Sequence, residues 1–297
     1  MSRKLHRTLS VAIAATLVAI AGCGGGGGGG SPAASAAAPT TFALDTCAAT
    51  FVADSAVTYT LTNQQWQKFS GAPIDGFTQC VHGLTTMTSA TDVITWNSGV
   101  PDNSVLSYPS VVYGKIPGYN TSTTPRLPAL VTALPSLKVN GTVQTTCSDT
   151  VVRGTTYTCK YDTAFDMYLV DAAGTKNGEV MIFTEMAGQD VTQYPGYIGQ
   201  YNIGGDTYQV LNRLVTIPDV SNHTSSTWKY LAFVSTTPIQ NFINFDIAPF
   251  IAFGLDTGGL NHLTNPILAT DKLSSVEMGT EVISGVGTTT ISNYSIN

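Results

Sequence analysis

The sequence contains few charged residues. Only 11% of its 297 residues are Asp, Glu, Lys or Arg, and 19 acidic residues outnumber 13 basic ones. A chain with a formal net charge of -6 does not attract a phosphate backbone, so nucleic acid is not an expected partner. A neutral polymer such as a polysaccharide meets no such electrostatic penalty.

Several catalytic and ligand-binding motifs are absent. The sequence has no Gly-x-Ser-x-Gly segment for a serine nucleophile and no His-Glu-x-x-His zinc motif. The seven glycines Gly24–Gly30 are followed by neither the lysine nor the helix of a phosphate-binding loop. A zinc site is the weaker interpretation of the cysteines, because no Cys-x-x-Cys occurs and His82, His223 and His262 are scattered. No cofactor and no metal are therefore expected.

The one long apolar run near the N-terminus is too short to cross a bilayer comfortably. It extends from Thr8 to Gly22 and follows the basic residues Arg3, Lys4 and Arg7, which predicts a signal peptide over residues 1–22. The run ends in Ile-Ala-Gly-Cys at Cys23, which resembles a bacterial lipoprotein box, with cleavage before the cysteine and lipid attached to it. An ordinary cleaved signal peptide with an incidental cysteine is the alternative.

Residues 23–41 consist of Gly, Ser, Pro, Ala and Thr around the attachment cysteine and predict a tether that cannot bury a core. No linker, repeat or charge block follows, so residues 42–297 are expected to form one domain. Without the three basic residues of the signal peptide, the chain would have 10 basic and 19 acidic residues, a net charge of -9. We expect a secreted monomer that meets a membrane only through its lipid anchor. A glycine after Cys23 favours the outer membrane where one exists; otherwise the protein is extracellular.

Four cysteines remain once the lipidated one is set aside. An even number in an oxidising compartment predicts two disulfides, and four cysteines allow three pairings. We favour Cys47 with Cys80 and Cys147 with Cys159, the second of which closes a short loop.

Most of the domain shows the period-two alternation of β-strands. The clearest segments are Ala56–Thr62, Asp92–Trp96, Ala164–Val170, Gly178–Glu185, Tyr208–Leu214, Trp228–Ser235 and Ser275–Ile283. One helix is predicted from Thr237, with Pro238 at its first position and an apolar stripe from Ile239 to Phe250 that would pack on a sheet. Many strands and one helix predict a single β-sandwich or barrel.

Three of these strands place carboxylates on one face, because alternate residues of a strand point the same way. Glu179 and Glu185 share a face with Met181 and Phe183, and Asp166 shares one with Tyr168. Glu277 and Glu281 form the third such pair. A mixture of carboxylates with aromatic and apolar groups suits a carbohydrate cleft. The solvated outer face of a sandwich fits the alternation equally well.

The segments in order resemble glycoside hydrolase family 12, the small endoglucanases and xyloglucanases, over nearly all of residues 45–297. The matching segments are Thr46–Phe51, Tyr59–Trp66, Gly76–Cys80, Ile94–Gly99, Leu106–Gly114, Ala164–Tyr168, Gly178–Phe183 and Met278–Thr288. The resemblance implies a concanavalin-like β-jelly-roll sandwich with a concave substrate cleft and one short helix. It also strengthens the Cys47–Cys80 pairing.

The resemblance assigns roles to three carboxylates. It implies that Glu179 is the nucleophile and Glu281 the acid/base of a retaining endo-β-1,4-glucanase. Two carboxylates suit this chemistry, because one attacks the anomeric carbon while the other protonates the leaving oxygen. Asp166 resembles the third carboxylate, which contacts the nucleophile. Glu185 and Glu277 receive no role and are interpreted as rim or structural residues.

The resemblance also implies a set of substrate-binding residues. Trp66 matches a tryptophan that stacks on a sugar, Asn63 lies in the same segment, and Pro195 lies in a loop that borders the cleft. Trp96 is interpreted as either a cleft or a core residue, and Trp228 as core. Tyr168, Met181 and Phe183 complete the expected substrate contacts. Phe183 and Asn97 stand where the family usually has tryptophan, which leaves the preferred β-glucan open.

Two hypotheses of other classes compete with the enzyme. A surface lipoprotein of this fold could bind carbohydrate without cutting it, and an adhesion or structural sandwich would have no affinity for glucan. The presence of Glu179, Glu281 and Asp166 together favours the enzyme, because binding alone needs no such trio.

Overall fold

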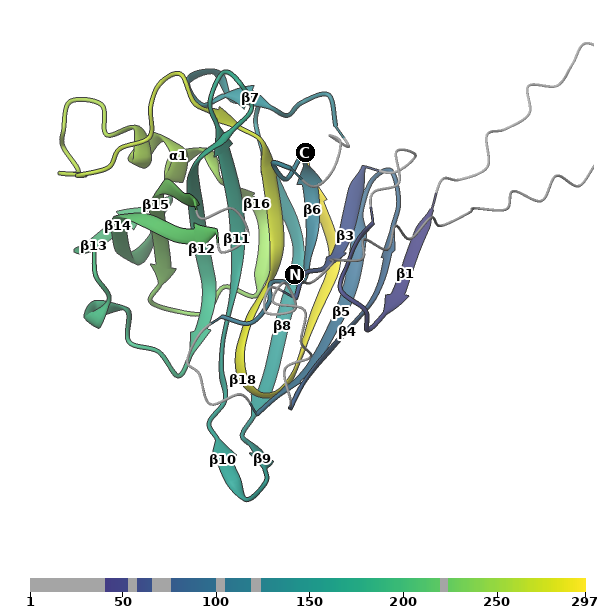
Figure 1. Ribbon diagram of the computed structural model, residues 1–297. Coiled ribbons are helices and arrows are strands. Elements are labelled where there is room, and N and C mark those ends of the chain that lie inside the picture. Colours follow the sequence, from purple (N-terminus) through teal and green to yellow (C-terminus); the bar gives the residue numbers. More distant parts are fainter. Residues whose placement is uncertain (1–40, 53–57, 66–75, 100–104, 119–123, 220–223) are drawn as a thin grey trace, which may run out of the picture. The chain divides into compact units, whose positions relative to one another are not determined.

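The computed structural model describes residues 41–52, 58–65, 76–99, 105–118, 124–219 and 224–297. The compact unit of residues 39–297 therefore contains all of them. It is mostly β-sheet, with a single α-helix among the described residues (Figure 1). The strands are β1 (Phe42–Thr46), β2 (Thr50–Val52), β3 (Tyr59–Asn63), β4 (Phe77–Thr85), β5 (Ala90–Ser98), β6 (Ser110–Gly114), β7 (Ala129–Leu130), β8 (Lys138–Ser148), β9 (Thr150–Val152), β10 (Thr155–Tyr157), β11 (Lys160–Val170), β12 (Lys176–Ala187), β13 (Tyr197–Ile203), β14 (Asp206–Asp219), β15 (Thr224–Ser235), β16 (Asn241–Asp246), β17 (Lys272–Leu273) and β18 (Ser275–Ile296). The helices are α1 (Ala248–Leu255) and the 3-10 turns η2 (Val131–Ala133) and η3 (Val191–Gln193).

Most of the strands form two sheets that share the long strand β18; β9 and β10 pair only with each other, and the short strands β17 and β7 extend the edge of β11. The first sheet has the order β1-β4-β5-β18-β8-β16, and the second has the order β2-β3-β6-β18-β11-β12-β15-β14-β13. The first part of β18, up to Ser284, pairs with β6 and β11, and the part from Gly285 pairs with β5 and β8. Gly285 has a φ of 96°, a backbone conformation that favours glycine where the strand passes between sheets. The yellow ribbon of β18 in Figure 1 runs through both sheets.

The main core lies between the two sheets. Inward-facing residues of β4, β5 and β8 meet those of β11, β12 and β15, as the alternation predicts. Phe165 of β11, for example, lies 5.1 Å from Phe242 and 5.5 Å from Phe245 of β16, measured between ring centroids. A fully buried aromatic or aliphatic side chain of this size stabilises the fold by about 1.5–3 kcal/mol. The domain is thus a β-jelly-roll sandwich.

A ring of four threonine hydroxyl groups lies among these apolar residues. Thr145 bonds to Thr163 and to Thr289, at 2.9 Å each, and Thr280 closes the ring with oxygen–oxygen distances of 3.3 Å to Thr163 and 2.8 Å to Thr289. Each hydroxyl group can donate once and accept once around such a ring, so these polar groups are paired inside the sandwich.

The predicted helix is displaced in the structure. Residues 241–246, expected to be helical, form strand β16 on the edge of β8, and the helix extends over Ala248–Leu255 instead. Backbone pairing with β8 outweighs the helical pattern here, and Asn244 adopts a φ of 52°, which a helix does not permit. Ile243, placed on the apolar stripe by the sequence, is 83% exposed. No helix among the described residues is long and apolar enough to cross a membrane.

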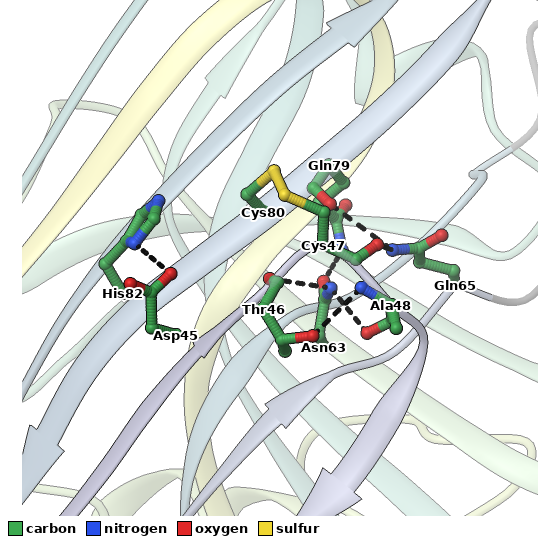
Figure 2. The surroundings of a disulfide bond; sticks show 9 residues. All are labelled: Asp45, Thr46, Cys47, Ala48, Asn63, Gln65, Gln79, Cys80 and His82. Atoms are coloured by element: carbon green, nitrogen blue, oxygen red, sulfur yellow. Dashed lines mark hydrogen bonds and ion pairs between the residues drawn. A yellow bond between two sulfur atoms is a disulfide. The ribbon is translucent and has the colours of Figure 1, made fainter.

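Two disulfides close loops in this domain. They join Cys47 to Cys80 and Cys147 to Cys159, the pairings favoured from the sequence. The first ties the segment after β1 to β4 and is drawn in Figure 2.

Candidate active site

Five carboxyl groups gather on the face of the second sheet that points away from the main core. We call them the carboxylate cluster; its members are Asp162 and Asp166 of β11, Glu179 of β12, and Glu277 and Glu281 of β18. The three strands are neighbours, because β11 pairs with β12 on one side and with β18 on the other. Apolar residues of the same face, among them Ala164 and Met181, form a second core beside the cluster. The prediction that Asp166, Glu179 and Glu281 point away from the core side of their strands is thus correct.

Glu281 and Asp162 are cross-strand partners whose carboxyl groups share a hydrogen bond. Burial, the negative charge of Asp162 and this hydrogen bond raise the pKa of Glu281 well above its ordinary value. Burial also raises the pKa of Asp162 to about 7, but the bond from Glu281 and a bond from Gln189 act in the opposite direction. The shared proton therefore resides on Glu281, which donates it toward Asp162.

Asp166 lies at the centre of the cluster and is fully shielded from solvent. Its pKa is raised well above the ordinary value, first by burial and then by the charges of Glu179 and Glu277. The hydroxyl group of Tyr168, next on the same face, bonds to Asp166. Asp166 therefore holds a proton more readily than an ordinary aspartate.

Glu179 differs from the other members because a cation faces it. The Nζ atom of Lys176 lies 2.7 Å from Oε2 of Glu179 and donates a hydrogen bond to it. The side chain of Glu179 is 12% exposed and that of Lys176 is 26% exposed. An ion pair in this partly dry setting is screened less than one on the open surface.

Glu277 points to the same face but has no exposed surface. Its carboxyl group accepts hydrogen bonds from Ser110, at 3.1 Å, and from Ser275, at 3.4 Å. Burial raises its pKa to about 8, so it is protonated at neutral pH. The geometry fits the structural role expected from the sequence.

The expectation that Glu185 shares the face of Glu179 is wrong. The register between β11 and β12 shifts at Thr184, so Glu185 pairs with Thr163 rather than continuing the alternation. It accepts a 2.7 Å hydrogen bond from the hydroxyl group of Tyr161, which belongs to the main core. A β-bulge reverses the alternation here by adding one residue to one strand.

Trp96 is a core residue, which corrects its predicted place in the substrate-binding set. Its side chain is only 3% exposed and packs against Tyr161 in the main core, at 6.0 Å between ring centroids. Gly287 of β18 lies directly against the indole, where a Cβ atom would approach it to 2.1 Å. Its neighbour Asn97 is exposed instead.

Asn63 is also unable to bind a substrate directly, contrary to expectation. It has no exposed surface, and its amide nitrogen donates to the carbonyl oxygens of Ala48, at 2.9 Å, and Thr46, at 3.4 Å. Its amide oxygen accepts a hydrogen bond from Gln79. Figure 2 shows these bonds beside the disulfide, where Asn63 holds the segment that joins β1 to β2.

The other expected substrate contacts differ in accessibility. Met181 and Phe183 lie on the correct face, but they are only 2% and 3% exposed and belong to the second core. Tyr168 is partly exposed beside the cluster, and Pro195 is exposed after η3. Trp66 and the attachment residue Cys23 lie outside the described residues.

Sequence reasoning missed three residues of this face. Asp162 is two positions before Ala164, the first residue of the predicted strand. A predicted strand that began two residues earlier would have placed Asp162 on the same face. Trp228, interpreted as core, is partly exposed and stands over the ammonium group of Lys176 at 3.8 Å from ring centroid to Nζ. Lys176 itself could not be found by alternation, because a bulge separates it from Glu179. Over the described ranges, no three His, Cys, Asp or Glu side chains are arranged to hold a metal ion.

Comparison with known proteins finds a matching family and similar structures. The family model for glycosyl hydrolase family 12 matches residues 57–297. Among solved structures, the native family 12 xyloglucanase from Bacillus licheniformis is similar with a TM-score of 0.65 and 19% identity, over 87% of this chain and 99% of that one. Endoglucanase 3 from Trichoderma harzianum has a TM-score of 0.63 and 16% identity, over 86% and 97% of the two chains. A search of the curated proteins gives no match. The chain belongs to glycosyl hydrolase family 12 and is a glycoside hydrolase.

Proposed function

We propose that this protein is a retaining endo-β-1,4-glucanase in which Glu179 is the nucleophile and Glu281 the acid/base. One observation carries the assignment. Glu281 holds a proton that it shares with Asp162, whereas Glu179, two strands away, faces the ammonium group of Lys176. A double displacement needs this difference, with one carboxyl group protonated and the other ionised in the same site.

The proposed reaction follows from these two states. A carboxylate oxygen of Glu179 attacks the anomeric carbon as the bond to the leaving oxygen breaks, and the proton of Glu281 passes to that oxygen. Water then attacks the glycosyl-enzyme, giving its proton to Glu281, and the carboxylate of Glu179 leaves. Retaining enzymes hold the two carboxyl groups about 5–5.5 Å apart. Asp162 positions the proton, and Asp166, as a neutral neighbour, leaves the charge of Glu179 available for attack.

A β-glucan chain is the proposed substrate. The names of similar structures describe endoglucanases and xyloglucanases, and one describes a xyloglucanase domain in complex with cellobiose, with a TM-score of 0.57 and 16% identity. We propose that the glucan lies along a cleft over the carboxylate cluster, with Trp66 stacking on one sugar and Tyr168 and Pro195 beside it. The protein is proposed to act as a monomer without a cofactor.

The test combines activity with stereochemistry. Wild-type protein should release reducing sugars from carboxymethylcellulose, mixed-linkage glucan or xyloglucan, and proton NMR of the first product should show the β-anomer. Glu179→Gln and Glu281→Gln should each reduce turnover by about 10²–10⁴-fold or more without loss of the folded state. Glu185→Gln is the matched control, because Glu185 lies on the other side of the strand, bonded to Tyr161.

Three outcomes would contradict the proposal. Near-wild-type turnover in either active-site variant would show that the reaction uses other groups. An α-configured first product would replace retention with inversion. Binding of glucan without any release of reducing sugar would identify a carbohydrate-binding lipoprotein instead.

We also propose the cellular location from the sequence. Cleavage before Cys23 and acylation of that cysteine would attach the enzyme to the bacterial cell envelope through the Gly-, Ser-, Ala- and Pro-rich segment 23–41. Several acyl chains make a durable anchor, because each buried CH₂ group contributes about 0.8 kcal/mol. A tethered hydrolase would act on polymers too large to enter the cell.

A further inference from the structure

Lys176 is turned toward Glu179 by a bulge in β12. On β11, Tyr168 and Val170 share a face; Tyr168 pairs with Glu179, and Val170 pairs with Lys176. Asn177 is the extra residue between them, because Leu169 already pairs with Gly178. In a regular strand Asn177 would occupy the position of Lys176, and the lysine would face the opposite side. The bulge therefore aims the cation at the cluster.

The bulge is anchored on a buried aspartate. The amide nitrogen of Asn177 donates to Oδ1 of Asp271, which is only 1% exposed. The second oxygen of Asp271 accepts the backbone N–H of Leu268, at 2.9 Å, and lies 3.8 Å from Nζ of Lys229. Because three groups hold this carboxylate, it fixes the position of Asn177 and, with it, the direction of the neighbouring Lys176 side chain.

Two aromatic rings hold the ammonium group of Lys176. Its Nζ atom lies 4.2 Å from the ring centroid of Tyr168 and 3.8 Å from that of Trp228. A cation over an aromatic face is attracted by the ring, and contact with two rings also restricts a side chain with four rotatable bonds. The lysine is thus held in place beside Glu179 before any substrate arrives.

The surroundings of this ion pair are otherwise acidic. The titratable and charged groups that face the pair, or lie next to those that do, are Asp162, Asp166 and Tyr168 of β11, Glu277 and Glu281 of β18, Tyr230 of β15, Arg213 of β14, and the anchoring pair Lys229 and Asp271. Arg213 stacks on Tyr230, at 5.2 Å from its ring centroid, and Lys229 faces Asp271. Lys176 is therefore the cation that directly faces the cluster within the described part of the chain.

We propose that Lys176 is a positioning residue of the active site, which pairs with Glu179 and holds its carboxylate oriented for attack among four other carboxyl groups. This inference rests on the proposed function of Glu179 as nucleophile. The ammonium group stabilises a carboxylate but not the ester that forms in the glycosyl-enzyme. It should therefore extend activity to lower pH and favour departure of the carboxylate when water attacks.

The first experiment compares pH profiles of kcat/KM for an aryl β-cellobioside. Lys176→Met should shift the acidic limit of activity, the pH below which kcat/KM falls, to higher pH. We expect a loss of kcat/KM on the order of tenfold on the acidic side, because hydrogen bonds to charged groups are stronger than those between neutral groups. Lys176→Arg keeps the positive charge and should restore most of the activity on the acidic side of the profile. Lys138→Met removes an exposed lysine of β8, in the other sheet, and should leave the acidic limit where it is in wild type.

The second experiment measures turnover of the covalent intermediate. Enzyme labelled with a 2-deoxy-2-fluoro-β-cellobiosyl group should reactivate more slowly in Lys176→Met than in wild type, because the leaving carboxylate has lost its cation. Trp228→Leu should slow reactivation in the same direction and Trp228→Phe less so, because phenylalanine keeps an aromatic face for the ammonium group.

The outcomes separate this inference from the proposed function. An inactive wild type would contradict the function itself. An active wild type whose acidic limit and reactivation rate are unchanged in Lys176→Met would contradict only the role of the lysine. A uniform loss at every pH that arginine does not restore would show a purely structural role and would also overturn the inference.

Discussion

The carboxyl group of Glu281 donates a hydrogen bond to that of Asp162, its partner across β18 and β11. The pair binds one proton between two acids, and the neighbouring charge and burial keep that proton on Glu281. A protonated carboxyl group is what a general acid requires near neutral pH. Asp162 thus joins the catalytic site as a positioning residue for its acid.

Replacing Asp162 should change the basic limit of activity, which is the pH above which kcat/KM falls. The negative charge of Asp162 and its acceptance of the hydrogen bond both raise the pKa of Glu281, so Asp162→Asn should lower that pKa. Glu281 would then lose its proton at lower pH, and the basic limit of kcat/KM would shift downward. The measurement is the pH profile for an aryl β-cellobioside.

Glu277→Gln provides the matched comparison for Asp162→Asn. Glu277 is bonded to Ser110 and Ser275 and is not among the groups that shift the pKa of Glu281, so its removal should leave the basic limit in place. A basic limit in Asp162→Asn that coincides with that of wild type would contradict the proposed pairing.

Changes at Trp96 should alter stability and not substrate affinity. Trp96→Ala would empty a buried site between the sheets and should lower the free energy of unfolding by about 3–5 kcal/mol. Trp96→Phe should cost less and leave KM unchanged, as measured by denaturant unfolding and by kinetics on soluble glucan. A several-fold rise in KM with unaltered stability would show that Trp96 binds substrate and would contradict its assignment to the core.

Removal of the Asn63 side chain should weaken the fold in a similar way. Asn63→Ala leaves the buried amide nitrogen of Gln79 and the carbonyl oxygen of Ala48 without this partner, which should cost about 1–3 kcal/mol. Asn202→Ala on β13, where the side chain is exposed, should stay within about 0.5 kcal/mol of wild type. Equal stability of the two variants in urea unfolding would argue against this interpretation.

Mutation of Cys23 should release the protein from the membrane. In cells given a labelled fatty acid, wild-type protein should incorporate the label and sediment with membranes, whereas Cys23→Ser should do neither. Ser31→Ala in the same segment should behave like wild type. Label that persists in Cys23→Ser would rule out this attachment site.

Strand alternation predicted the part of the site that lies in regular strands. Asp166, Glu179 and Glu281 face the same side because β11, the middle of β12 and the first part of β18 have continuous register there. The same rule failed at Glu185 and could not find Lys176, because the extra residues Thr184 and Asn177 reverse the alternation. A bulge depends on the partner strand, and no single strand contains that information.

Tertiary context decided the other errors. The segment from Asn241 to Asp246 has an amphipathic helical pattern, but the free edge of β8 pairs with it as a strand. Trp96 alternates as the sequence predicts, yet the sequence does not tell which face of β5 is covered by the second sheet. The order of the family-like segments was needed to choose the two glutamates from the other carboxylates.

The most direct test of the two-glutamate mechanism is to find the residue that becomes glycosylated. The enzyme is incubated with an activated 2-deoxy-2-fluoro-β-cellobioside, digested, and sequenced by tandem mass spectrometry. The mechanism predicts a single fluorocellobiosyl group on Glu179, with Glu281 unlabelled. A label on another carboxylate, or full turnover of glucan with no covalent adduct and an inverted product, would contradict it.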